Sequence, residues 1–160
     1  MNQEFKFTYQ KLSNSNELSG EEQLLLNQAR DATSNAYAPY SNFNVSAVAK
    51  LHNGEIVKGT NQENASYPVG ICAERVLLST ISSLFPNTPI EILAISYDNK
   101  NGSSNHAISP CGMCRQALVE YEGRTGAPMK IIMSGQEGEV IVLESAKTLL
   151  PFSFSVDDMK

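Results

Sequence analysis

Three cysteines are the residues of this chain whose type and spacing favour metal chemistry. Cys111 and Cys114 stand three positions apart in SPCGMCRQAL, and Cys72 lies upstream in ICAER. A Cys-x-x-Cys pair alone fits a redox pair, half of a structural zinc site or part of a catalytic metal site. Three converging thiolates would bind Zn²⁺ and leave its fourth tetrahedral position open, as catalytic zinc sites do.

Two helices must position these thiols. Apolar residues recur at helical spacing over residues 72–85, and Pro110 suits the first position of a second helix that carries Ala117, Leu118 and Tyr121. All three cysteines therefore fall at predicted helix N-termini. There the positive end of the helix dipole favours the thiolate over the thiol.

Glu74 is the candidate proton carrier. It follows Cys72 by two positions, so its carboxylate could reach a water in the open zinc position without binding the metal. Acidic residues favour the first turn of a helix in any case, and only the position beside Cys72 favours a catalytic role. Three thiolates leave excess negative charge around Zn²⁺. Arg75 could offset it by donating to a ligand sulfur, and Arg115 is a second candidate.

Two other interpretations of the cysteines explain less of the sequence. A redox pair of Cys111 and Cys114 would leave Cys72 and Glu74 without a role. A structural zinc site needs a fourth Cys or His ligand. His52 and His106 are the two histidines, in a predicted turn and a polar loop, and we expect both to be solvated.

Composition narrows the class of ligand. The chain has 160 residues, a net charge of −5 and only 12 Lys and Arg, with no basic cluster, which argues against a nucleic-acid polymer as substrate. No secretory signal is recognisable, and no apolar run approaches the roughly 18 residues of a membrane span. Three cysteines, an odd number, fit thiols kept reduced in the cytosol. We therefore expect a small-molecule substrate, no membrane and a cytoplasmic location.

The remaining pattern predicts an α/β fold with a mixed five-stranded sheet and helices packed on its faces. Ser19 and Glu22 form a capping-box pattern for a first helix, and Asn53-Gly54 marks a hairpin turn. The predicted helices cover residues 20–36, 72–85 and the segment after Pro110, and the predicted strands cover residues 43–51, 55–64, 91–98, 129–135 and 138–144. Residues 1–18 are expected to be an extension ordered only in part, and residues 19–160 a single domain.

Cys-Ala-Glu-Arg at 72–75 with Pro-Cys-Gly-Met-Cys-Arg-Gln at 110–116 resembles the cytidine deaminases, in their small homotetrameric branch. The segments YAPYSNFNV, GTNQENASYPVGICAER and LLPFSF extend the resemblance from about Ala38 to the C-terminus. It implies a three-layer α-β-α fold, one Zn²⁺ per chain and hydrolytic deamination of cytidine and deoxycytidine in pyrimidine salvage. It also implies a homotetramer whose sites are completed by neighbouring subunits.

The resemblance also implies roles for residues that composition alone would not single out. Asn61 and Glu63 would bind the ribose hydroxyls, and Phe43 would pack against the nucleoside. Phe154 would stack on the base in a neighbouring subunit's site, and Tyr67 would lie near a subunit boundary. The backbone around Ala73 and Cys111 would bind the pyrimidine edge. By residue type alone, Phe43 and Phe154 are more often core residues.

Few positions depart from the family pattern. Ser46 stands where glycine is usual, Met113 stands where a small residue is common, and the first 18 residues have no counterpart. Two alternatives stay open at this point. The chain could act on another aminopyrimidine nucleoside, as the related blasticidin-S deaminases do, or it could be a zinc-dependent structural or interaction protein without turnover. The Asn-x-Glu element argues against the first alternative, and Glu74 argues against the second.

Overall fold

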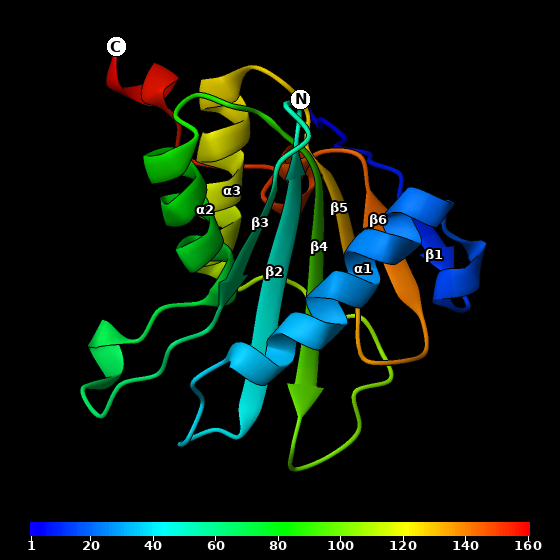
Figure 1. Cartoon of the computed structure of the whole chain (residues 1–160). Coiled ribbons are helices and arrows are strands. Elements are labelled where there is room, and N and C mark those ends of the chain that lie inside the picture. The colour runs from blue at the N-terminus through cyan, green and yellow to red at the C-terminus, as the bar shows by residue number, and fades with distance from the viewer.

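The computed structural model describes residues 1–160 and shows a twisted mixed sheet with helices on both faces (Figure 1). The sheet order is β1-β6-β5-β4-β2-β3, and only the β4–β5 pair is parallel. The strands are β1 (Gln10–Leu12), β2 (Phe43–Leu51), β3 (Ile56–Thr60), β4 (Ile90–Asn99), β5 (Lys130–Ser134) and β6 (Val140–Leu143). The α-helices are α1 (Gly20–Ala32), α2 (Ala73–Leu84) and α3 (Gly112–Thr125).

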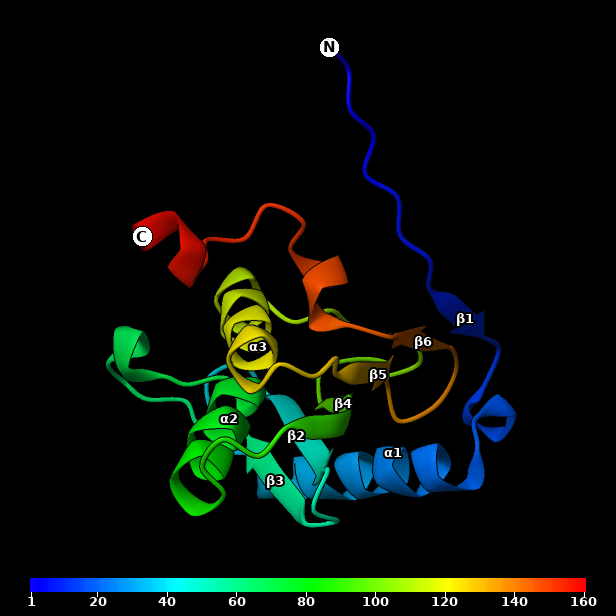
Figure 2. The ribbon, with the colours of Figure 1, turned by 90° about the horizontal axis from the view of Figure 1, so that it is seen from above.

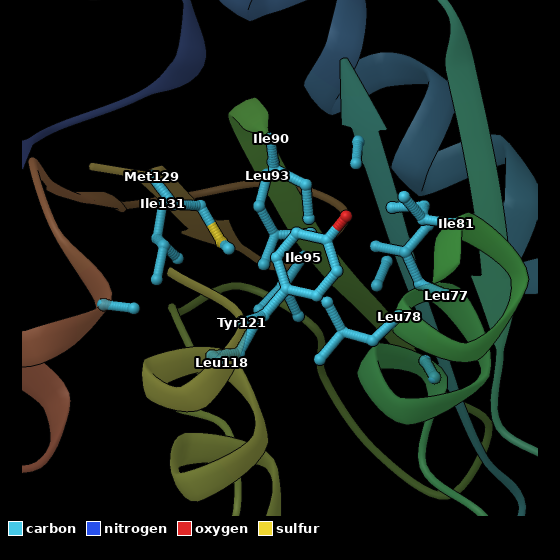
Figure 3. Packing of buried hydrophobic residues seen from close by; sticks show 14 of the residues in the cluster. Leu77, Leu78, Ile81, Ile90, Leu93, Ile95, Leu118, Tyr121, Met129 and Ile131 are labelled. Atoms are coloured by element: carbon cyan, nitrogen blue, oxygen red, sulfur yellow. The ribbon is translucent and has the colours of Figure 1, made fainter. Parts of the chain in front are cut away.

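The three-layer arrangement follows from two sets of buried side chains, one on each face of the sheet. Helices α2 and α3 lie side by side on one face, and α1 covers the other (Figure 2). The larger apolar cluster lies under α2 and α3, where Leu77, Ile81 and Leu118 meet Leu93 and Ile95 of β4 (Figure 3). A smaller cluster lies under α1. The helices that carry the cysteines are therefore the ones fixed by the main core.

The predicted elements are confirmed in type, with changes at their ends. Helix α1 stops at Ala32 and continues as a single 3₁₀ turn, Thr33–Asn35. Strand β3 stops at Thr60 because the chain beyond it leaves the ladder, and Gln62 makes only isolated bridges to Tyr37 and Ile71. The hairpin turn is confirmed, and Gly54 has the positive φ of 87° that such a turn requires.

The predicted count of five strands is short by one. Residues 10–12 pair antiparallel with β6 and form β1 at the edge of the sheet. Three residues, Gln-Lys-Leu, are too short to show an alternating pattern, and only Leu12 packs against the core. The division into an extension of residues 1–18 and a domain of residues 19–160 stays a prediction, although the sheet takes in part of the first segment. None of the helices combines the length and apolar character that crossing a bilayer requires.

Candidate functional site

The three cysteine sulfurs come together at one end of the sheet. The Sγ atoms of Cys72 and Cys111 are 3.9 Å apart, those of Cys111 and Cys114 are 3.5 Å apart, and all three lie within 4.8 Å of one another. A Zn–S bond of about 2.3 Å and tetrahedral angles place two ligand sulfurs about 3.8 Å apart. The donor set and its spacing therefore fit Zn²⁺. Neither histidine belongs to the group.

The helix starts explain why the sulfurs converge. Cys72 is the N-cap residue of α2 and Cys111 is the N-cap residue of α3, and neither thiol makes a capping hydrogen bond. Cys114 lies in the first turn of α3 and is fully buried. Pro110 was predicted at the first helical position, but it precedes the N-cap, because Cys111 keeps an extended backbone with ψ of 167°. Both helix dipoles point their positive ends at the sulfurs.

Two of the three thiols have pKa values shifted in opposite directions. A hydrogen bond from the Cys114 thiol lowers the pKa of Cys72 to about 6, although burial and the Glu74 carboxylate act against this shift. The same hydrogen bond, together with burial, raises the pKa of Cys114. A first thiolate therefore opposes a second one beside it. A divalent cation among the sulfurs removes this opposition, because it favours the thiolate at all three positions.

Glu74 lies in the first turn of α2 and is only 4% exposed. Burial raises its pKa, which its own backbone N–H and the Cys114 thiol lower in part. A carboxyl group in such an environment exchanges a proton more readily near neutral pH than an exposed one does. Its nearness to Cys114 places it beside the three sulfurs and among the groups that can do chemistry there.

The two arginines are placed differently from each other. Arg75 contributes the smallest of the effects on the pKa of Cys72, a Coulombic lowering that ranks after those of Cys114, burial, Glu74 and Cys111. Its guanidinium makes no hydrogen bond to a sulfur. The guanidinium of Arg115 donates to the carbonyls of Pro110, at 2.8 Å, and Leu149, at 3.3 Å. Arg115 thus braces the start of α3, whereas Arg75 acts on the charge of the site.

A surface hollow of about 370 Å³ lies beside the segment that contains Asn61 and Glu63. Tyr40, Ser41, Glu63, Asn64, Tyr67 and Gly70 line it. The Glu63 carboxylate accepts hydrogen bonds from the backbone N–H groups of Tyr40, at 2.9 Å, and Ser41, at 3.2 Å, and from the Ser41 hydroxyl. Burial alone would raise the pKa of Glu63, but these hydrogen bonds hold it below its ordinary value. The carboxylate is therefore ionised.

A comparison with known protein families identifies the family that has this arrangement of residues. The model of the cytidine and deoxycytidylate deaminase zinc-binding region matches residues 19–126, which include all three cysteines and Glu74. The chain belongs to this deaminase family.

Relatives with this fold support the assignment along most of the chain. The chain is 31% identical to a cytidine deaminase of Halalkalibacterium halodurans over 137 residues, which cover 86% of this chain and 96% of the relative. It is 32% identical to one of Mycobacterium tuberculosis over 136 residues, 85% of this chain and 91% of the relative. The crystal structure of the Burkholderia pseudomallei cytidine deaminase superposes with a TM-score of 0.71 at 34% identity, and covers 86% of this chain and all of that one.

The other residues predicted for this deaminase fall into two groups. Phe43 begins β2, and the side-chain amide of Asn61 brackets it, with Nδ2 donating to the Phe43 carbonyl at 2.9 Å and Oδ1 accepting from the Val45 N–H at 2.7 Å. Ala73 is buried at the first position of α2. Tyr67 and Phe154, by contrast, are 74% and 60% exposed. These two aromatic rings find little cover within their own chain.

Two kinds of residue beside the predicted substrate contacts were missed from the sequence. Tyr40 and Ser41 line the hollow through a turn whose backbone Glu63 binds, and their place in APYSN was the only available signal. Tyr97 lies behind Phe43, with ring centroids 5.0 Å apart. Nothing in EILAISYD distinguishes this tyrosine from a core residue of a buried strand, because the contact joins segments more than 50 residues apart.

Proposed function

We propose that this chain catalyses the zinc-dependent hydrolytic deamination of cytidine and deoxycytidine to uridine and deoxyuridine, with release of ammonia, in pyrimidine salvage. Cys72, Cys111 and Cys114 hold the metal, and Glu74 moves the protons. One observation carries the assignment of residues: α2 and α3 begin side by side, so that three sulfurs within 4.8 Å of one another adjoin a buried carboxylate. Three reduced thiols that act as ligands also suit a cytosolic enzyme.

Zn²⁺ in this site would act as a Lewis acid and lower the pKa of a water in its fourth position. Three thiolates carry one negative charge more than Zn²⁺ neutralises, so the two helix N-termini and Arg75 matter to the charge balance. Each of them stabilises negative charge on the sulfurs and leaves more of the cation's charge for the reaction.

Glu74 performs two proton transfers. Its carboxylate accepts a proton from the water that attacks C4 of the base and delivers that proton to N3. A second proton then passes from the new hydroxyl on C4 to the amino nitrogen. The C4–N4 bond breaks, ammonia leaves, and C4 becomes the carbonyl carbon of uridine. The raised pKa of Glu74 suits a group that must both accept and donate at neutral pH.

Glu63 lines the hollow and supports the proposed substrate contacts on the sugar side. The Tyr40–Ser41 turn holds the Glu63 carboxylate in place, and the carboxylate accepts hydrogen bonds from the ribose hydroxyls. The Asn61 amide uses one donor and one acceptor position on β2 and keeps one of each for the sugar. Phe43 packs against the nucleoside, and the backbone at Ala73 and Cys111 binds the pyrimidine edge.

The test of the catalytic assignment is ammonia release from cytidine by the purified protein, with zinc content measured alongside. Glu74→Gln should keep one zinc per chain and lose at least about 100-fold in kcat, because proton transfer by a positioned carboxylate contributes that much or more. Glu122→Gln is the matched control. Glu122 is equally buried on α3, but it binds the backbone N–H groups of Met129 and Ala146, so its loss should lower stability and spare kcat. Equal activity of Glu74→Gln and wild type would contradict the role of Glu74.

We further propose a homotetramer in which Phe154 completes a neighbouring subunit's site and Tyr67 lies near a subunit boundary. Support comes from the exposure of these rings and of Phe152, which is 94% exposed. Phe154→Ala should raise KM, and co-expression of Phe154→Ala with Glu74→Gln chains should restore turnover in mixed oligomers. In them, a site with an intact Glu74 receives Phe154 from its neighbour. A monomer by light scattering, or no recovery on co-expression, would contradict this proposal.

A further inference from the structure

Tyr97 is a buried tyrosine that the proposed reaction does not use. It lies near the end of β4 and is 1% exposed. A buried phenol hydroxyl needs a hydrogen-bond partner. Here the hydroxyl lies 3.2 Å from Nδ1 of His106, which belongs to the loop of residues 100–110. Burial also raises the pKa of Tyr97, so the hydroxyl keeps its proton.

The ring of Tyr97 supports Phe43. The two rings are stacked, with centroids 5.0 Å apart and planes at 16°. The backbone of Phe43 is held separately, because its N–H donates to the Ser41 hydroxyl and its carbonyl accepts from Asn61. Ser41 and Asn61 thus fix the backbone of Phe43, and Tyr97 fixes the position of its ring. Without the tyrosine ring, a half-buried phenylalanine at the start of a strand has no firm backing.

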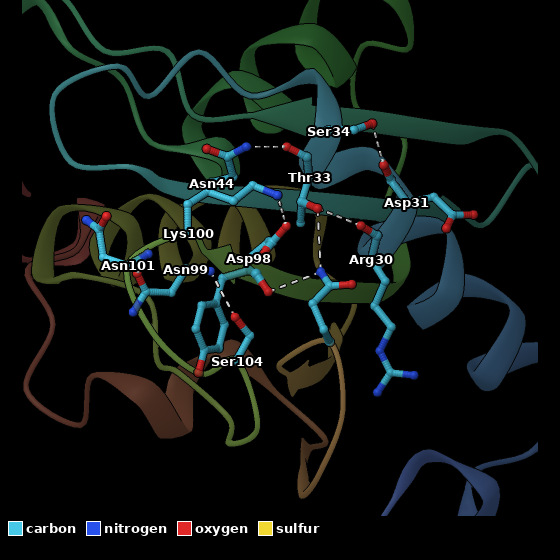
Figure 4. A network of polar contacts seen from close by, with 12 residues as sticks. Arg30, Asp31, Thr33, Ser34, Asn44, Asp98, Asn99, Lys100, Asn101 and Ser104 are labelled. Atoms are coloured by element: carbon cyan, nitrogen blue, oxygen red, sulfur yellow. Dashed lines mark hydrogen bonds and ion pairs between the residues drawn. The ribbon is translucent and has the colours of Figure 1, made fainter.

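The loop of residues 100–110 is held on its other side as well. Ser104 is buried, and its hydroxyl accepts from the Asn99 N–H at 2.8 Å (Figure 4). The turn between β5 and β6 lies against the same stretch, and a Cβ added at Gly135 or Gly138 would collide with the backbone of Ser104 or Asn105. The loop is therefore clamped at residues 104 and 105. His106 is the next residue, and five positions later the chain reaches Cys111.

We propose that Tyr97 is a positioning residue for nucleoside binding, which links the Phe43 wall of the site through His106 to the loop that leads into the zinc-binding helix α3. Tyr97 is neither one of the proposed nucleoside contacts nor one of the three cysteine ligands. Its ring and its hydroxyl together set the spacing between the residue that packs on the nucleoside and the segment that ends in Cys111. This inference rests on the proposed function, because it takes Phe43 as a nucleoside contact.

The expected kinetic signature is a change in KM. Phe43 contacts the nucleoside in the ground state and the transition state alike, so loosening it removes uniform binding. Tyr97→Phe keeps the stacked ring and removes only the hydroxyl bond to His106. We expect KM for cytidine to rise about fivefold, the loss that one hydrogen bond typically produces, with kcat within about twofold of wild type. Inhibition by uridine should weaken by the same factor.

Tyr121→Phe is the matched control, because it separates positioning from stability. Tyr121, on α3, is also buried, and its hydroxyl donates at 2.7 Å to the carbonyl of Thr88, which lies between α2 and β4 in a segment without a predicted site residue. Both variants should lose a similar amount of thermal stability, and only Tyr97→Phe should change KM. A fall in melting temperature with unchanged KM in Tyr97→Phe would overturn the inference.

His106→Ala tests the same link from its exposed end. It leaves the buried Tyr97 hydroxyl without a partner, so the melting temperature of this variant is measured beside its KM. The variant should raise KM as Tyr97→Phe does, and the double variant should be no worse than either single one, because both remove the same bond. His52→Ala, in an exposed turn, should leave KM unchanged. Full additivity of the two changes would refute the link. A wild-type chain that did not deaminate cytidine would refute both the proposed function and this inference. An active wild type with an unchanged KM in the double variant would refute the inference alone.

Discussion

The start of α1 and the starts of α2 and α3 are built in opposite ways. At α1, Ser19 and Glu22 form a reciprocal capping box: the Ser19 hydroxyl accepts from the Glu22 N–H, and the Glu22 carboxylate accepts from the Ser19 N–H at 3.0 Å. At α2 and α3 the N-cap residues are Cys72 and Cys111, whose thiols make no capping bond. The difference separates a helix start that serves the fold from two that serve a site.

A cysteine at the N-cap lowers the stability of its helix, since a Ser, Thr, Asn or Asp cap stabilises a helix by about 1 kcal/mol. Other contacts must hold α2 and α3 in place. The larger apolar cluster lies beneath them, and α2 approaches β3 so closely that a Cβ at Gly59 would collide with the backbone of Ala73 and Leu77. Arg115 braces α3 through the Pro110 carbonyl. The sulfurs thus stay available to a metal, whose binding stabilises the folded state in turn.

Cys72→Ser breaks this contrast most directly, because it gives α2 the type of cap that α1 has. The hydroxyl can accept from the first-turn N–H groups, but it is a poor replacement for a thiolate as a zinc ligand. We expect zinc content to fall well below one per chain and kcat/KM to fall by more than about 100-fold, since loss of a supporting residue alone can cost that much.

The same variant should be more stable than wild type once zinc has been removed from both by a chelator. A gain of up to about 1 kcal/mol in the free energy of unfolding is expected, measured by urea denaturation at fixed protein concentration. Ser19→Ala is the counterpart at α1. It should lose about 1 kcal/mol and keep full activity and full zinc. Zinc at full occupancy in Cys72→Ser would contradict the three-ligand site.

Local patterns in the sequence predicted both kinds of helix start. Ser19-x-x-Glu22 is a short-range signal, and so is Asn53-Gly54, and both were found at the expected positions. The zinc residues were also predicted, because each of the three cysteines is marked by its immediate neighbours. The packing of α2 and α3 on one face of the sheet brings the two cysteine motifs together. The resemblance to a known family implied this packing, and the helical periodicity alone did not.

Features that depend on contacts between distant segments were not predicted. Strand β1 forms because residues 10–12 pair with the edge strand β6, and these three residues show no alternating pattern of their own. Tyr97 has a role only because β2 begins beside the end of β4, opposite Asn99 in the register. The bracing by Arg115 likewise depends on Leu149, in a different part of the chain. Residue type alone assigns such side chains to the core or the surface.

The smallest effect is expected at Glu22, where the α1 cap meets an ion pair. Burial alone would raise the pKa of Glu22, but hydrogen bonds from Lys130, with Nζ 2.9 Å from Oε1, and from Ser19 hold it below its ordinary value. A lowered pKa means that ionised Glu22 stabilises the folded state above its unfolded pKa, and that this contribution is lost as the pH falls through the folded-state pKa.

Glu22→Gln keeps the shape of the cap and removes the charge, so its effect should depend on pH. At pH 7 the free energy of unfolding should fall by about 0.5 kcal/mol. At a pH below the folded-state pKa of Glu22, wild type and variant should converge, because the wild-type carboxyl is then protonated as well. Glu4→Gln removes one partner of an exposed ion pair with Lys6 and should leave the free energy of unfolding unchanged at both pH values. Turnover at pH 7 should match wild type, since α1 lies on the face of the sheet away from the cysteines. A loss of stability that is equal at both pH values would show that the cap, and not the charge, is what Glu22 contributes.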